Sequence, residues 1–90
     1  MKNIAWDSWK EGQRLHHRSY WDNGTDRFQV DISLDTSYAY QSNASCLVWS
    51  KADQKWSHVC YVPFDQIKRE DYDTKLVTKL LALAEQIIGT

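Results

Sequence analysis

The clearest pattern in the chain is an alternation of core-type and polar side chains that begins at Phe28. Because successive side chains of a strand point to opposite faces, this period of two predicts a β-strand with one buried face. Unbroken, such a strand would span ~43 Å at about 3.3 Å per residue, so we expect a bend or bulge near residues 35–37. The predicted core face consists of the even positions Phe28, Val30, Ile32, Leu34, Thr36, Tyr38 and Tyr40.

A second strand-like run, residues 13–21, comes before this strand, and a polar turn signal separates the two. Two hairpin registers compete there. A type I′ turn at residues 23–24 would place Arg18 opposite Gln29. A type II′ turn at residues 24–25 gives better cross-strand pairs, each contributing roughly 0.2–1 kcal/mol, so we favour it. Its facing pairs are Trp21 with Phe28, Leu15 with Leu34, Arg14 with Asp35 and Arg18 with Asp31.

Two further strands complete the predicted sheet. A reversal at residues 51–55 leads into the last strand, residues 56–62, which Pro63 ends because proline has no N–H to donate. The result is a four-stranded antiparallel meander over residues 13–62. An earlier reversal at residues 42–43 sets the facing pairs Tyr40 with Ser45, Tyr38 with Leu47 and Thr36 with Trp49.

The last two of these strands are apolar on both faces, at residues 46–49 and 59–62. A strand of this kind is typical of a sheet that is covered on both sides. The N-terminal segment, residues 1–12, could supply the second cover through Trp6 and Trp9. Another protein chain is the alternative, because an exposed apolar patch of this kind marks an interface.

One amphipathic helix is predicted near the C-terminus. Asp73 fits the N-cap position, the helix runs from Thr74 to about Ile88, and Gly89 ends it. We expect its apolar face to pack against the core face of the sheet, with helix pairing across a dimer as the alternative. The fold class is therefore a single α+β domain, residues 1–90, with the helix (residues 73–88) on one face of the four-stranded sheet. The apolar positions of the helix are Leu76, Val77, Leu80, Leu81, Leu83, Ala84, Ile87 and Ile88.

Composition narrows the class of protein without identifying a function. A chain of 90 residues with a net charge of −1 forms one domain with a modest core, and it carries no strong basic footprint. It has no run of 18 apolar residues and no signal-peptide pattern, so we expect a cytoplasmic protein without membrane insertion. Cys46 and Cys60 form no CxxC motif, and two free thiols are favoured over a disulfide in a reducing compartment.

Two sets of residues could support other chemistry. The segment with Arg14, His16, Arg18, Tyr20 and Trp21 is basic and aromatic, which is typical of single-stranded nucleic-acid binding. In the favoured register, however, two aspartates face its arginines. His17 should point inward, so it makes a poor metal pair with His16. A small enzyme or metal protein built on His58 and Cys60 is the third class considered, although no catalytic motif is present.

We therefore expect a non-enzymatic protein-binding module that acts by stoichiometric occupation of a partner surface, with no cofactor and no metal. Small inhibitors of host proteins encoded by phages or mobile elements are a weak analogy. The partner is another protein, a homodimer is allowed, and single-stranded nucleic-acid binding is the alternative. Aromatic residues are the expected anchors: Trp6, Trp9, Tyr38, Tyr40, Trp49 and Trp56.

Overall fold

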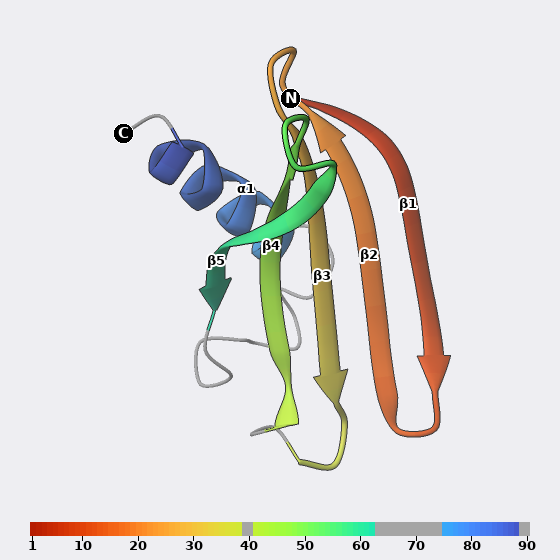
Figure 1. The fold of residues 1–90 in the computed structure, drawn as a ribbon. Coiled ribbons are helices and arrows are strands. Elements are labelled where there is room, and N and C mark those ends of the chain that lie inside the picture. Colours follow the sequence, from red (N-terminus) through yellow and green to blue (C-terminus); the bar gives the residue numbers. More distant parts are fainter. Residues whose placement is uncertain (39–40, 63–74, 89–90) are drawn as a thin grey trace.

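The computed structural model describes residues 1–38, 41–62 and 75–88. It shows an α+β fold with an antiparallel sheet and one C-terminal helix, but the sheet has five strands rather than the expected four (Figure 1). The strands follow one another as a meander in the order β1-β2-β3-β4-β5. The elements are β1 (Lys2–Glu11), β2 (Arg14–Asp22), β3 (Arg27–Asp35), β4 (Asn43–Ser50), β5 (Lys55–Val62) and α1 (Lys75–Ile88).

The additional strand is the N-terminal segment, so the sheet begins at Lys2 and not at residue 13. β1 pairs with β2 through a tight hairpin in which Gly12 adopts a φ of +60°. Trp6 lies opposite Ser19, and Trp9 lies opposite His16. The alternative in which these two tryptophans cover a face of the sheet is wrong, because β1 extends the sheet sideways. Its sequence does not alternate cleanly and every residue in it is exposed, which is why periodicity did not reveal the strand.

The hairpin between β2 and β3 has the predicted register. Trp21 lies opposite Phe28, and Arg18 lies opposite Asp31. The turn places Gly24 at a φ of +93°, as the first central position of a type II′ turn requires. The Asn23 side chain stabilises this turn, because its Oδ1 accepts the N–H groups of residues 25 and 26 at 2.9 and 2.7 Å.

The predicted register between β3 and β4 is wrong. β3 ends at Asp35, whose Oδ1 accepts the N–H groups of Ser37 and Tyr38, both at 2.8 Å, so the chain turns away there. Tyr38 is 52% exposed in this loop instead of facing the core. Tyr40 lies outside the described residues. The Asp35 N–H also donates to Ser42 Oγ at 2.9 Å, which closes the loop.

The observed β3–β4 register differs from the expected one by an odd number of residues, so β4 presents its faces the other way round. Val30 lies opposite Cys46, and Phe28 lies opposite Val48. Cys46 and Val48 therefore belong to the core and do not form an exposed patch, whereas Leu47 and Trp49 point to the face without the helix.

A bulge in β5 explains its apolar run. Cys46 lies opposite Cys60 and Leu47 lies opposite His58, so Val59 is an additional residue on β5. Both Val59 and Cys60 pack against the core as a result. The apolar run of this strand thus needs no second cover.

The helix occupies the predicted position. α1 lies over β3, β4 and β5, and we call this side of the sheet the helix face and the other side the open face (Figure 1). The expected packing against Val30, Ile32 and Leu34 is confirmed, since these side chains share one core with α1. The last two apolar helix positions, Ile87 and Ile88, remain exposed. The expected N-cap Asp73 and the terminating Gly89 lie outside the described residues. Five α1 side chains are buried: Leu76, Val77, Leu80, Leu81 and Ala84.

Candidate binding surface on the open face

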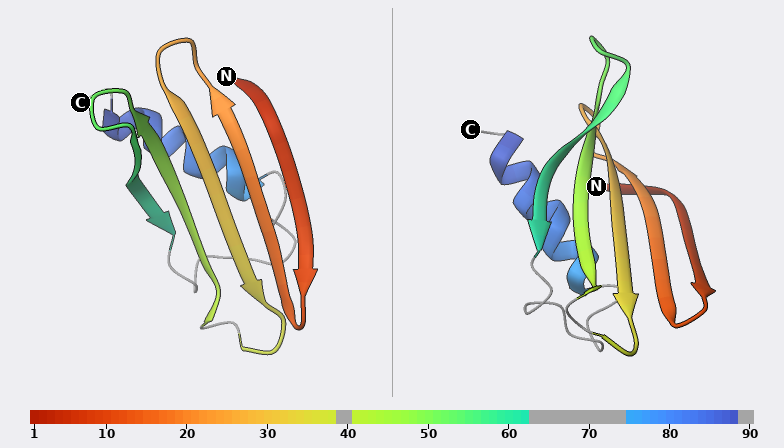
Figure 2. Two further views of the ribbon diagram at one scale, coloured as in Figure 1. Left: turned by 45° about the vertical axis from the view of Figure 1, so that its right-hand side comes forward. Right: turned by 60° about the horizontal axis from the view of Figure 1, so that its bottom comes forward.

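The open face is strongly curved at the end where the β4–β5 hairpin lies. Tyr20 of β2 and Trp56 of β5 have ring centroids 5.8 Å apart, although β3 and β4 lie between their strands. In a flat sheet these strands would lie roughly 14 Å apart at about 4.8 Å per strand. The β5 bulge increases the local twist, and the β4–β5 hairpin is strongly twisted relative to the rest of the sheet (Figure 2, right). The hairpin therefore bends over the open face.

This curvature gathers three aromatic side chains, Tyr20, Trp49 and Trp56, which we call the aromatic cluster. Trp49 and Trp56 lie opposite each other on β4 and β5, with centroids 5.5 Å apart at 60°. The Tyr20 ring contacts the Trp56 ring at an interplanar angle of 51°. All three side chains are half-buried, so each still presents part of its ring to a partner. Tilted contacts of this kind hold aromatic rings in fixed orientations.

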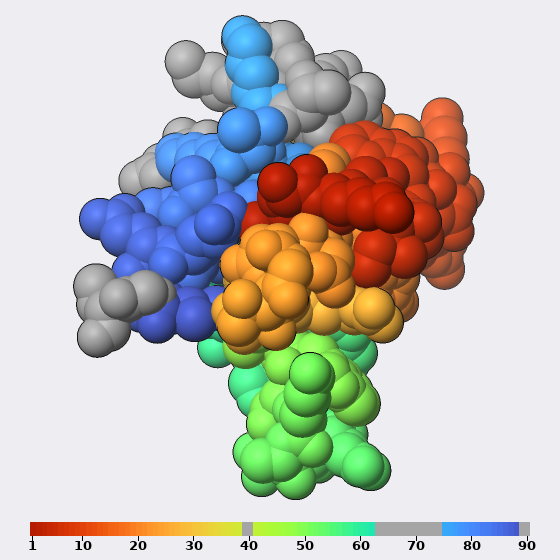
Figure 3. Space-filling view, turned by 90° about the horizontal axis from the view of Figure 1, so that it is seen from above, coloured from red at the N-terminus to blue at the C-terminus, as the bar shows by residue number. Residues whose placement is uncertain are grey.

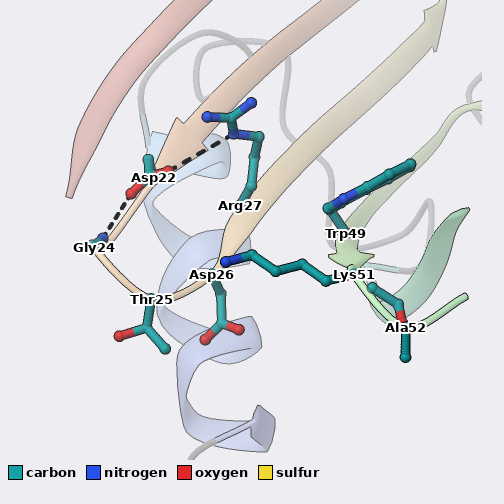
Figure 4. Close-up of a pocket in the computed structure, with 9 residues that line it drawn as sticks. Asp22, Gly24, Thr25, Asp26, Arg27, Trp49, Lys51 and Ala52 are labelled. Carbon is teal, nitrogen blue, oxygen red and sulfur yellow. Dashed lines mark hydrogen bonds and ion pairs between the residues drawn. The ribbon is translucent and has the colours of Figure 1, made fainter. Parts of the chain in front are cut away.

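The surface beside the aromatic cluster is hollowed. A cavity of about 610 Å³ separates the β2–β3 turn from the β4–β5 turn. Lys51 extends from the second turn toward the first across this cavity (Figure 4). Seen from above, the β4–β5 hairpin projects beside the β2–β3 hairpin (Figure 3). A smaller cavity of about 230 Å³ is lined by Arg27, Trp49 and Trp56.

Arg27 is the side chain common to these cavities, because it also lines a third one of about 450 Å³ on the β1 side. Sequence reasoning did not select it. The confirmed β2–β3 register carried the necessary signal, since it places Arg27 opposite Asp22 and on the same face as Tyr20. Its Nε lies 3.7 Å from Asp22 Oδ2 in an exposed ion pair.

The other arginines of the open face also have acidic neighbours, as the register predicted. Arg18 Nε donates to Asp31 Oδ1 at 2.6 Å, and this hydrogen bond raises the pKa of Arg18 further above its ordinary value. Arg14 donates to Ser33 Oγ at 2.8 Å and lies 3.9 Å from Asp35 Oδ2. Each of these three arginines thus has an aspartate neighbour that offsets its charge.

Asp35 has a depressed pKa. Its carboxylate accepts the backbone N–H of Tyr38, then that of Ser37, and these bonds favour the charged form over the opposing effect of desolvation. Gln13 and Arg14 add smaller contributions in the same direction. The charged carboxylate thereby holds the loop that ends β3.

The remaining predicted anchors are not part of the aromatic cluster. Trp9 stacks on His16 at the β1 edge of the open face, with centroids 5.0 Å apart at 15°. Trp6 points to the helix face, where its ring lies 4.1 Å from that of His17. Trp21 is also on the helix face, packed against the core. The structure therefore separates Trp21 from the other residues of the predicted nucleic-acid set.

The residues considered for metal or nucleophile chemistry are held apart. His17 is buried beside Ile32 as expected, with its ring nitrogens 3.4 Å from Ser8 Oγ and 3.0 Å from Ser19 Oγ. His58 lies on the open face, whereas Cys60 points to the helix face. Burial raises the pKa of the Cys46 thiol to about 12 and also raises that of Cys60. Among the described residues, no three His, Cys, Asp or Glu side chains converge into a metal-binding group.

Comparison of the chain with protein families, with curated proteins and with solved structures gives no match. In the part of the chain that the structure describes, no helix has both the length and the apolar character needed to cross a membrane.

Proposed function

We propose that this protein is a non-enzymatic module that binds another protein through its open face. The observation that carries the proposal is the convergence of the aromatic cluster, at centroid separations of 5.5 and 5.8 Å, beside the cavities that meet at Arg27. Tryptophan, tyrosine and arginine are the residues that most often dominate the binding energy of protein interfaces. The half-buried rings are already ordered by each other, so binding orders fewer side chains.

The charge distribution supports a protein partner over a nucleic acid. Phosphate recognition requires unpaired positive charge, and here Arg18 and Arg27 are both engaged by aspartates. An interface with neutralised ion pairs at its rim and aromatic rings at its centre has the anatomy of a protein–protein contact. Leu47, which is half-buried on the same face, adds apolar area beside the rings.

We extend the proposal to the mode of action. A module of this size without a catalytic motif would act stoichiometrically, by covering a surface of its partner in the cytoplasm, as small inhibitors encoded by phages and mobile elements do. Titration of the purified partner should then saturate at a fixed molar ratio. Continued turnover of a partner at substoichiometric amounts of this protein would contradict the proposal.

The test begins with affinity purification from the native host and continues with binding measurements on the captured partner. Trp56→Ala should weaken binding by about thirty-fold or more, since an interface hot spot contributes about 2 kcal/mol or more. Ile87→Ala is the matched control, because it removes an exposed apolar side chain from α1, on the side of the sheet opposite the open face. Equal effects of the two substitutions would show that the open face is not the binding surface.

Single-stranded nucleic-acid binding is kept as the second candidate on one observation. Tyr20 and Arg18 lie on the open face with Trp56, which offers rings on which bases could stack. Phosphate contacts would make affinity fall steeply as salt concentration rises, whereas an aromatic protein interface would respond little. Salt-insensitive binding to a protein, with no retention of oligonucleotides, would remove this candidate.

A further inference from the structure

β1 is an edge strand whose outer side has no partner among the described residues. It is ten residues long, pairs only with β2, and has every residue exposed. Every second residue of such a strand directs its N–H and C=O groups away from the sheet, which makes the edge a template for another strand. From Ala5 to Glu11 the strand runs without a bulge, and its sequence contains neither proline nor glycine.

The opposite edge of the sheet is protected. β5 carries the bulge at Val59, which interrupts its ladder, and it lies under α1. Bulges and a covering helix are two of the devices by which proteins prevent strand addition at an edge. Among the described strands, the two edges of the sheet therefore differ, and β1 is the one that offers a long regular ladder.

We propose that β1 pairs antiparallel with β1 of a second copy of this chain, so that two five-stranded sheets join into one continuous sheet. The pairing is centred on Trp6, which lies opposite Trp6 of the second copy. A two-fold axis perpendicular to the sheet keeps both faces continuous and allows a residue to lie opposite itself. The dimer uses a surface distinct from the aromatic cluster.

The side chains of β1 favour this register over the one centred one residue further along. Centring on Trp6 places Asp7 opposite Ala5. Ile4 is an additional residue in β1, so it shifts the facing positions of residues 2 and 3 by one residue. Lys2 therefore lies opposite Trp9 on the open face. Centring one residue further along would place two Asp7 carboxylates directly opposite each other, and facing like charges destabilise a sheet.

Centring on Ser8 avoids like charges but shortens the ladder. Residues before Ala5 would then have no residue opposite them, because β1 of the second copy ends at Glu11. The Trp6 register therefore gives the longest overlap without facing like charges.

On the helix face, the paired tryptophans have an apolar surface beside β1 to pack against. Trp6 lies 6.2 Å from the Trp21 ring at 77°, and a cavity of about 80 Å³ separates these indoles from Val77 and Thr78 of α1. Trp6 is 43% exposed in the isolated chain. Pairing two copies buries both indoles against each other, which adds apolar area to a contact that strand edges alone would make small.

A register-specific cross-link tests the proposal. In Trp6→Cys the new thiols face each other at the separation of directly opposite strand residues, which suits a disulfide. Mild oxidation with a low-molecular-weight disulfide should give a covalent dimer whose bridging peptide, identified by mass spectrometry, joins position 6 to position 6. Each bridge forms as two thiols lose two protons and two electrons, which reduce the added disulfide to two thiols. Ser8→Cys lies on the same face, two residues along the strand from position 6. It is the matched control and should cross-link at least ten-fold less.

Unmodified protein provides a second measurement that does not depend on the variant folding. Sedimentation should show a concentration-dependent dimer, and hydrogen exchange at the outward amides of β1 should slow as the dimer forms. A monomer at all concentrations, or β1 exchange that is independent of concentration, would overturn the proposal. Preferential cross-linking through position 8 would overturn the register. Slowing of β1 exchange only when a different protein is added would assign the edge to another partner and equally overturn the proposal.

Discussion

The substitution Leu80→Ala tests the placement of α1 on the sheet. Leu80 is 0% exposed, and its side chain belongs to the core that α1 shares with the sheet. Removing a fully buried leucine side chain costs about 3–5 kcal/mol, because transfer energy is lost and a cavity remains. In a domain of this size each 1 kcal/mol lowers Tm by about 4–8 °C, so we expect a decrease of roughly 12–40 °C.

Ile87→Ala is the control for this experiment. Ile87 belongs to the same apolar arc of the helix but is 49% exposed, so we expect its truncation to change stability by about 1 kcal/mol or less. Both variants should be unfolded by heat and by urea at one protein concentration, since association also shifts Tm. A Leu80→Ala cost below about 1 kcal/mol, or equal costs at the two positions, would refute the helix placement.

The β2–β3 turn, the loop after β3 and the buried Cys46 thiol can each be tested by one measurement. Gly24→Ala should destabilise the protein by about 1–3 kcal/mol in urea unfolding because a φ of +93° strains any L-residue, and an unchanged midpoint would contradict the turn. Asp35→Asn should lower Tm at neutral pH. The Tyr38 and Ser37 N–H groups lower the pKa of Asp35, so the difference in Tm between the unmodified protein and the variant should shrink as pH falls below about 4. A difference in Tm that does not change with pH would contradict this role of the carboxylate. Burial raises the Cys46 pKa to about 12, so this thiol should react with a thiol reagent only as the protein unfolds, and rapid labelling at pH 7 would contradict its burial.

The β2–β3 hairpin was predictable because several independent signals agreed on it. The turn residues, the aromatic pair of Trp21 with Phe28 and the charge pair of Arg18 with Asp31 all fit one register, and the structure has that register. The amphipathic helix was predictable because a single helical period extends over its whole length. Long, locally consistent patterns are the part of a fold that sequence specifies most directly.

The length of the alternating run correctly predicted a bend near residues 35–37, but the alternation did not show that β3 ends there. The period of two continues through Thr36 and Tyr38, but the strand stops at Asp35 because its carboxylate binds two backbone N–H groups of the following turn. A side chain that offers the backbone other hydrogen bonds competes with the ladder. Misplacing this end changed the β4 register by an odd number and exchanged its two faces.

The candidate site was only partly predictable. Trp49 and Trp56 were selected as aromatic anchors, and Tyr20 was selected for a different function, but nothing in the linear pattern brought them together. Their meeting depends on the bulge at Val59, which twists the β4–β5 hairpin over the open face. A bulge changes the count of facing residues by one, and a sequence with apolar residues on both faces gives no phase from which to detect it.

The most direct test of the proposed function is site-specific photo-crosslinking in extracts of the native host. A photoreactive phenylalanine analogue at His58 lies exposed on the open face, two positions from Trp56, and leaves the aromatic cluster intact. The same analogue at Lys79, exposed on α1, is the control. We predict one dominant protein adduct from position 58 that disappears in the Trp56→Ala background and is absent from position 79. An adduct of equal yield from position 79, or one that survives Trp56→Ala unchanged, would contradict binding through the open face.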